Sequence, residues 1–179
     1  MAIQEVLDGI ASYFGGPYDP TTRTYRSSPV AGVGVVRRAW PKDDRQEDYF
    51  NGMESGARTG CVIVVWIPRQ HEVRRALGGE HSGVKQTVYE VILNCYLRSR
   101  TAFAEDAQDD AYALRNALVE WMRRDRTLGG CVFQAGEHVT EGGGGGDGID
   151  FEYSPPETKA QLTKGFFTMR FAAVEFVEA

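Results

Sequence analysis

Residues 84–126 have the sequence VKQTVYEVILNCYLRSRTAFAEDAQDDAYALRNALVEWMRRDR, in which two hydrophobic periods meet. In its first part, apolar side chains recur at every second position, with Tyr89 and Leu93 on one face. This alternation predicts a long β-strand over residues 84–98. The opposite face also carries Glu90, so we expect it to be only partly covered.

Beyond residue 101 the hydrophobic period becomes helical. The apolar stripe consists of Phe103, Ala107, Ala111, Leu114, Leu118, Trp121 and Met122. Spacings of three and four predict a helix of about five or six turns. Acidic residues crowd its first half and arginines its end, an arrangement that opposes the helix macrodipole. Gly129 and Gly130 predict the end of this segment, because glycine readily takes the left-handed conformation that closes helices.

The rest of the chain adds a second helix and further strands around this unit. An apolar stripe that includes Val6 and Ile10 predicts a short opening helix, which ends at the Gly-Gly-Pro of residues 15–17. Apolar runs predict strands at residues 30–40, 61–67, 131–134, 149–153 and 162–177. Pro68 is expected to end the second of these strands. The last strand is expected to pair with residues 84–98.

These elements predict an α+β fold: a mainly antiparallel β-sheet with an N-terminal helix and one long central helix packed on one face. Leu114, Leu118 and Trp121 are expected to be the main contacts of the central helix with the sheet. The length of 179 residues favours a single domain, residues 1–179. Two polar excursions interrupt it, at about residues 69–83 and 141–148.

Composition and charge argue against several classes of function. The formal net charge of −5 argues against a protein that grips nucleic acid, which needs a surplus of Lys and Arg on the contacting face. No apolar run approaches the length of a membrane span. The first residues lack a basic segment followed by an apolar block, so no secretory signal is expected. We therefore expect a soluble protein made in the cytosol, without a membrane partner.

Candidate chemical sites are weak. The three histidines, His71, His81 and His138, lie in polar segments without paired ligands, so no metal site is expected. The carboxylates near the start of the central helix are better explained by the helix dipole and by solvation than by a bound cation. The glycines of GVG at residues 32–34 lack the third glycine of a dinucleotide loop. Ser82 lacks the context of a nucleophile elbow.

The cysteines are not expected to form a chemical site either. Cys61, Cys95 and Cys131 lie in apolar runs and are expected to be reduced structural thiols. We therefore expect no catalytic residues, no cofactor, no bound metal and no enzymatic activity. Residues 142–146 are all glycine, which predicts a mobile tip. Residues 17–29 and 41–53 are polar and are expected to form a surface loop and a solvated excursion.

The excursion at residues 69–83 is the best candidate for a contact with another protein. It is either a long loop or a charged hairpin whose second arm begins near Val84. Arginine is enriched at protein interfaces and binds carboxylates in bidentate geometry. The candidate contact residues are Arg69, His71, Arg74, Arg75, Glu80 and His81.

A family resemblance extends over roughly the C-terminal half. The resemblance is based on five segments: the strand VYEVIL at residues 88–93, the helix that follows, RDRTLGG at residues 124–130, QAGE at residues 134–137, and the long apolar strand that ends near Phe176. This segment order resembles the tail terminator and tail-to-head joining (tail completion) proteins of long-tailed bacteriophages.

The resemblance implies a ring, usually of six identical subunits, at the head-proximal end of a siphophage-like tail. Such a ring binds the end of the tube of tail tube protein, stops its polymerisation and offers its other surface to a head-completion or connector protein. Viral DNA passes through the lumen without specific binding. The family contributes no catalytic residues. The protein would be made in the host cytoplasm and reside in the virion.

Subunit size fits a ring. A domain of this length has a radius of gyration of about 16 Å, and six such subunits leave a hole wide enough for a DNA duplex. A negative lumen would keep the genome from adhering. Two alternatives stay open: a head-completion or neck connector protein of the same virion, and a small ligand-binding module or enzyme with a deep pocket.

Overall fold

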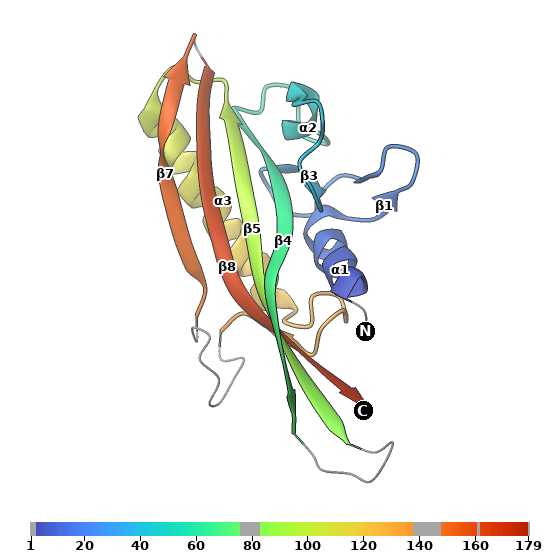
Figure 1. The fold of residues 1–179 in the computed structure, drawn as a ribbon. Coiled ribbons are helices and arrows are strands. Elements are labelled where there is room, and N and C mark those ends of the chain that lie inside the picture. Colours follow the sequence, from blue (N-terminus) through green and yellow to red (C-terminus); the bar gives the residue numbers. More distant parts are fainter. Residues whose placement is uncertain (1–2, 76–82, 138–147, 161, 179) are drawn as a thin grey trace.

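The fold is α+β, with helices behind a long, curled sheet (Figure 1). The structure is a computed structural model that describes residues 3–75, 83–137, 148–160 and 162–178. In chain order the elements are α1 (Ile3–Gly15), β1 (Tyr18–Asp19), β2 (Thr24–Tyr25), β3 (Val33–Arg37), α2 (Gln46–Tyr49), β4 (Thr59–Arg74), β5 (Val84–Ser99), α3 (Ala104–Arg124), β6 (Gln134–Ala135), β7 (Asp150–Lys159) and β8 (Leu162–Glu178). The predicted fold class is confirmed.

The main sheet has the strand order β3-β4-β5-β8, and both β6 and β7 pair with the far edge of β8. All of these pairings are antiparallel except that of β3 with β4. The predicted pairing of the C-terminal strand with residues 84–98 is confirmed, and it runs from Val84 opposite Glu178 to Ser99 opposite Thr163. β4, β5 and β8 therefore share one long ladder at the centre of the molecule.

The core lies between this sheet and the two long helices. Leu93, Leu118 and Phe167 are completely buried there. Trp121 is only partly buried and lies at the rim, where its indole N–H donates to the carbonyl of Tyr13 at 3.1 Å. The Tyr13 hydroxyl donates back to the carbonyl of Trp121 at 2.7 Å. This reciprocal pair joins α1 to α3, so Trp121 connects the helices as well as packing on the core.

The expectation that Pro68 ends a strand is wrong. β4 continues to Arg74, with a register shift between Trp66 and Arg69. Such a bulge accommodates a proline, which cannot donate a ladder hydrogen bond. β3 pairs with β4 only as far as Val64, so Pro68 also lies beyond the last strand neighbour on that side.

Other boundaries also differ from the expectation. The strand expected at residues 30–40 is limited to Val33–Arg37. The one expected at residues 131–134 is a turn followed by the two residues of β6, because Asp125 accepts hydrogen bonds from the N–H groups of Thr127 and Gly129 at 2.9 and 3.0 Å and folds the chain back. The predicted strand at residues 149–153 extends to Lys159. The expected loop at residues 17–29 contains the small β1–β2 hairpin.

Residues 41–53 are not merely a solvated excursion. They contain α2, whose Tyr49 is buried. A Cβ at Gly34 would lie 2.2 Å from the carbonyl oxygen of Asp48, and a Cβ at Gly60 would lie 2.2 Å from that of Tyr49. The two glycines therefore let α2 approach β3 and β4 closely, which gives the GVG segment a packing role.

Candidate functional site

A three-stranded arm projects from the body of the molecule (Figure 1). We define the arm as residues 69–75, 83–90 and 174–178, which are the far ends of β4, β5 and β8 together with the residue after β4 and the residue before β5. Its ladder runs from Arg69 opposite Glu90 to Arg74 opposite Lys85. The polar excursion at residues 69–83 is therefore a hairpin as far as the structure describes it.

The arm brings together four of the six predicted contact residues. Arg69, His71 and Arg74 lie in β4, Arg75 follows directly, and all four are exposed. Side chains alternate between the faces of a strand, so Arg74 lies on the face opposite to the other three. Glu80 and His81, like the glycine tip at residues 142–146, lie outside the described residues.

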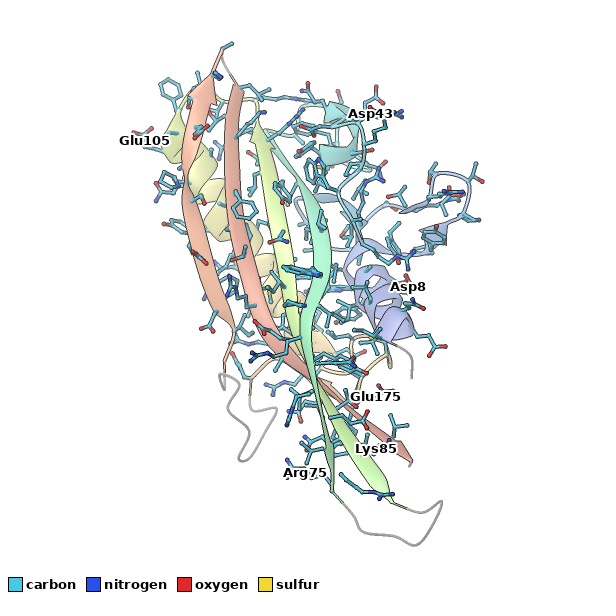
Figure 2. All side chains as sticks on the ribbon, in the orientation of Figure 1. Asp8, Asp43, Arg75, Lys85, Glu105 and Glu175 are labelled. Atoms are coloured by element: carbon cyan, nitrogen blue, oxygen red, sulfur yellow. The ribbon has the colours of Figure 1, made fainter. Side chains whose placement is uncertain are left out.

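Many polar side chains lie on the arm, among them Arg75, Lys85 and Glu175 (Figure 2), and bonds within the arm occupy some of them. Lys85 Nζ lies 3.0 Å from Glu72 Oε1, and Arg75 Nε donates to the side-chain oxygen of Gln86. At the base of the arm the buried Tyr89 hydroxyl donates to Glu175 Oε2 at 2.9 Å. Burial, and then this hydrogen bond, raise the pKa of Tyr89 above its ordinary value. A buried polar contact thus joins β5 to β8 at the base of the arm.

Two arm arginines differ from many arginines of the body. Arg58 binds Asp110, Arg98 binds Asp44, and Arg123 binds Glu137. Within the part of the chain that the structure describes, Arg69 and Arg74 form no ion pair. Their guanidinium groups are solvent-exposed and can form bidentate bonds to carboxylates of another molecule.

The sheet twists sharply where the arm leaves the body. From left to right, β8, β5 and β4 follow one another in the upper part of Figure 1, and this order is reversed in the arm. The bulge between Trp66 and Arg69 lies at this neck, and bulges increase the local right-handed twist of a strand. The arm therefore presents its faces in a different direction from the body.

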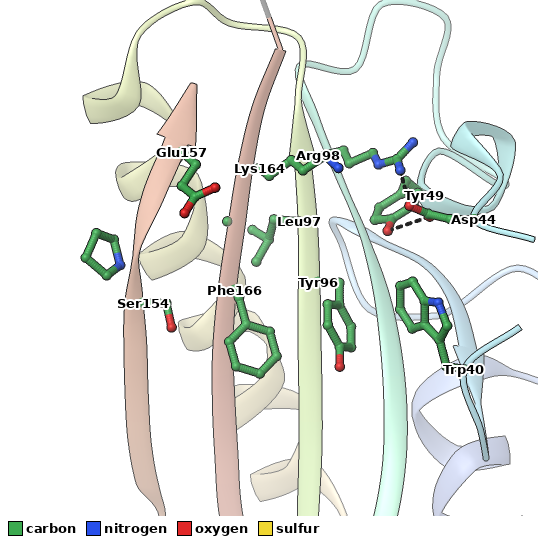
Figure 3. Close-up of a pocket in the computed structure, with 12 residues that line it drawn as sticks. Trp40, Asp44, Tyr49, Tyr96, Leu97, Arg98, Ser154, Glu157, Lys164 and Phe166 are labelled. Carbon is green, nitrogen blue, oxygen red and sulfur yellow. Dashed lines mark hydrogen bonds and ion pairs between the residues drawn. The ribbon is translucent and has the colours of Figure 1, made fainter. Parts of the chain in front are cut away.

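A shallow depression of about 340 Å³ lies on the sheet face opposite to α3 (Figure 3). Trp40, Tyr96 and Phe166 form a row across it, with ring centroids 4.4 and 4.9 Å apart. Three of its polar side chains are bound to one another: Asp44 accepts hydrogen bonds from Arg98 and from the Tyr49 hydroxyl. Burial and the bond to Asp44 raise the pKa of Tyr49. This arrangement fastens α2 to the sheet, and the sequence reasoning missed it.

The carboxylates at the start of α3 also have a structural role. Arg58 binds both oxygens of Asp110, and the Thr59 hydroxyl donates to the same carboxylate. Burial raises the pKa of Asp110, but the bonds from Arg58 and Thr59 outweigh it and lower the pKa below its usual value. These bonds attach α3 to the first residues of β4. From the sequence, the carboxylates were explained only by the helix dipole and by solvation.

The cysteines are unpaired thiols in the structure. Cys61 and Cys95 are buried, and Cys131 is partly buried in the turn after α3. Burial raises the pKa of the Cys131 thiol to about 11. Among the described residues, no group of three or more His, Cys, Asp or Glu side chains is placed to hold a metal ion. No described helix combines the length and the hydrophobicity needed to cross a membrane.

The motifs that carry the family resemblance form the connection from α3 to β6. The Asp125 turn lies in RDRTLGG, and Leu128 within it has a φ of 50°. In QAGE, Glu137 binds Arg123 and lies 3.8 Å from Arg126. Both motifs therefore stabilise the turn that places β6 against β8. Neither a scan against protein-family models nor a search of curated proteins finds a match to this chain.

Proposed function

We propose that this chain is a structural virion protein, the tail terminator of a long-tailed bacteriophage. Six copies form a ring that caps the tail tube, stops its polymerisation and provides the surface for head attachment. The observation that carries this proposal is the arm, an extension of paired strands with exposed arginines beyond a packed body. The resemblance of the C-terminal half to the tail terminator family supports it.

The division between body and arm suits a ring subunit. A subunit that must hold its shape against neighbours on two sides needs a packed core, which the sheet and the two long helices supply. It also needs a contact element that reaches past its own surface. Exposed arginines at the rim of such an element favour association with an acidic protein surface.

The test is electron microscopy of negatively stained protein, alone and mixed with tail tubes. We expect rings alone or at tube ends, and tubes that stop growing when the protein is added. The double variant Arg74→Glu/Arg75→Glu should weaken assembly or capping and leave the fold intact. The matched control is Arg23→Glu/Arg45→Glu, which makes the same charge change on exposed residues of the body.

Two results would count against the tail terminator, and a third against the role of the arm in it. Tubes that continue to grow in the presence of the folded protein exclude a terminator. Binding to isolated heads but not to tubes favours the neck connector. Assembly and capping that survive the arm reversal unchanged remove the arm from the contact surface. A variant that unfolds would show instead that the arm belongs to the core of the fold.

A further inference from the structure

The outer side of β4 is an open edge along the arm. Beyond the pairing of Arg37 with Val64, no described strand lies beside β4 on that side. The N–H of Arg75 donates to the carbonyl of Val84 at 2.8 Å. Since bonded and non-bonded pairs alternate in an antiparallel ladder, the backbone N–H and C=O groups of residues 70, 72 and 74 point away from β5.

Unpaired backbone groups of this kind are a template for an additional strand. We call the outer side of residues 69–74, beyond Pro68 and the bulge, the β4 edge. Its side chains are mostly exposed, so a second strand could approach without rearrangement of the body. Charged residues and a bulge often protect such an edge from unspecific pairing, and this edge carries charged residues and follows a bulge.

A second open edge lies on the opposite rim of the sheet. β7 pairs with β8 and with no other described strand, and α3 contacts it. Pro155 and Pro156 lie at a bulge between Ser154 and Glu157. Proline has no N–H to donate, so the part of β7 open to pairing is residues 150–154, which we call the β7 edge.

The two edges have opposite charges. The β4 edge and the residue after it carry Arg69, Arg74 and Arg75 against a single carboxylate, Glu72. Asp150 and Glu152 on the β7 edge are exposed, and residues 150–154 contain no cation. Pairing two β4 edges would bring arginines together, and pairing two β7 edges would bring carboxylates together. Like charges across a strand pair are destabilising, so each edge favours pairing with an edge of the opposite charge.

We propose that the β4 edge of one copy adds, as a further strand, to the β7 edge of a second copy. This inference rests on the ring of the proposed function and names the surfaces that form it. Each subunit contributes one edge of each kind, so the contact is head-to-tail and repeats from copy to copy. Main-chain hydrogen bonds supply affinity, and the charges select the partner and its orientation.

Two charge-reversed variants test this pairing. Arg69→Glu/Arg74→Glu gives a subunit whose two edges are both acidic, and Asp150→Lys/Glu152→Lys gives one whose edges are both basic. We expect each variant alone to stay monomeric at concentrations where the wild type forms rings, with an apparent Kd at least about tenfold higher. An equimolar mixture should form rings again. The acidic β4 edge of the first variant then pairs with the basic β7 edge of the second, and the basic β4 edge of the second pairs with the acidic β7 edge of the first. Mass photometry measures all three samples.

A backbone variant separates strand addition from simple charge attraction. Gln70→Pro removes an N–H that points to the open side, so the arm should fold and assembly should be lost. His71→Pro removes an N–H that bonds to β5 and should lower the thermal unfolding temperature instead. Circular dichroism establishes that each variant is folded before assembly is scored.

The outcomes separate this inference from the proposed function. Rings that persist in both charge variants, or a mixture of folded variants that stays monomeric, overturn the edge pairing. A chain that is monomeric at every concentration and still caps tubes also overturns it, and leaves only the capping role of the proposed function standing. Rings that depend on both edges but leave tubes uncapped support the pairing and count against the tail terminator.

Discussion

The body and the arm are built from the same three strands, yet they bury very different side chains. In the body half of β5, Val91, Leu93 and Cys95 are completely buried beneath the helices. In the arm half, the buried residues of β5 all carry polar groups, namely Gln86, Thr87 and Tyr89; Lys85 is partly exposed, and the facing residues of β4 are largely exposed. The ladder continues without interruption in β5, while the side chains around it change from an apolar core to polar and partly exposed groups.

Strand pairing and the burial of apolar side chains are therefore separate requirements of this fold. Main-chain bonds maintain the arm after the helices end, whereas the body gains its stability mainly from apolar area removed from water. Substitutions in the body should therefore change the free energy of unfolding. Substitutions in the arm should change association.

The largest effect is expected from a core aromatic of β8. Phe167→Ala removes a completely buried ring and should lower the free energy of unfolding by about 3–5 kcal/mol. Urea denaturation monitored by circular dichroism measures it. Phe176→Ala is the matched control on the arm end of the same strand, where the ring is 44% exposed and contacts Phe133. Equal losses at the two positions would abolish the distinction between body and arm.

A smaller loss is expected where α2 meets the sheet. Gly34→Ala places a methyl group against the backbone oxygens of Asp48 and Tyr49 and should cost about 1–3 kcal/mol. Gly165→Ala in β8 is the control, because its new Cβ would meet Leu97 at an ordinary contact distance of 3.5 Å. Thermal unfolding of both variants compares them. A neutral Gly34→Ala would mean that α2 does not pack as closely as described.

The attachment of α3 to β4 should depend on pH. Asp110→Asn weakens the bonds from Arg58 and Thr59 and should cost about 1 kcal/mol at pH 7. The pKa of Asp110 is lower in the folded chain, so its contribution is present above the unfolded value of about 4 and is lost as the pH falls through the folded value. Urea denaturation at pH 7 and pH 3 should show the difference from wild type shrinking in acid, and Asp109→Asn should show little difference at either pH.

The smallest effect is expected for the ion pair within the arm. Glu72→Gln breaks the contact with Lys85, whose side chain is 42% exposed, and should change the free energy of unfolding by less than about 0.5 kcal/mol. Added salt should reduce even this difference. A loss above 1 kcal/mol, measured by chemical denaturation in low salt, would show that side-chain bonds rather than the backbone ladder maintain the arm.

The central strand and helix were predicted correctly because two clear hydrophobic periods mark them. The pairing of that strand with the C-terminal strand was also predicted correctly. The prediction failed at Pro68, since a proline is compatible with a strand only at a bulge or an edge, and the edge is defined by where β3 ends. It also failed at Tyr49, whose burial depends on two glycines from distant strands. The exposed arginines were predicted as a contact, but the acidic edge of β7 could not be related to them before the strand order was known.

The bulge between Trp66 and Arg69 also determines how the chain tolerates insertions and deletions. Removal of one residue between these two positions would leave a regular ladder, with Trp66 still opposite Ile92 and Arg69 still opposite Glu90. Removal of one residue between 70 and 74 would instead transfer the side chains beyond it to the other face. The neck is thus a place where the length of the chain can vary while the arginines keep their orientation.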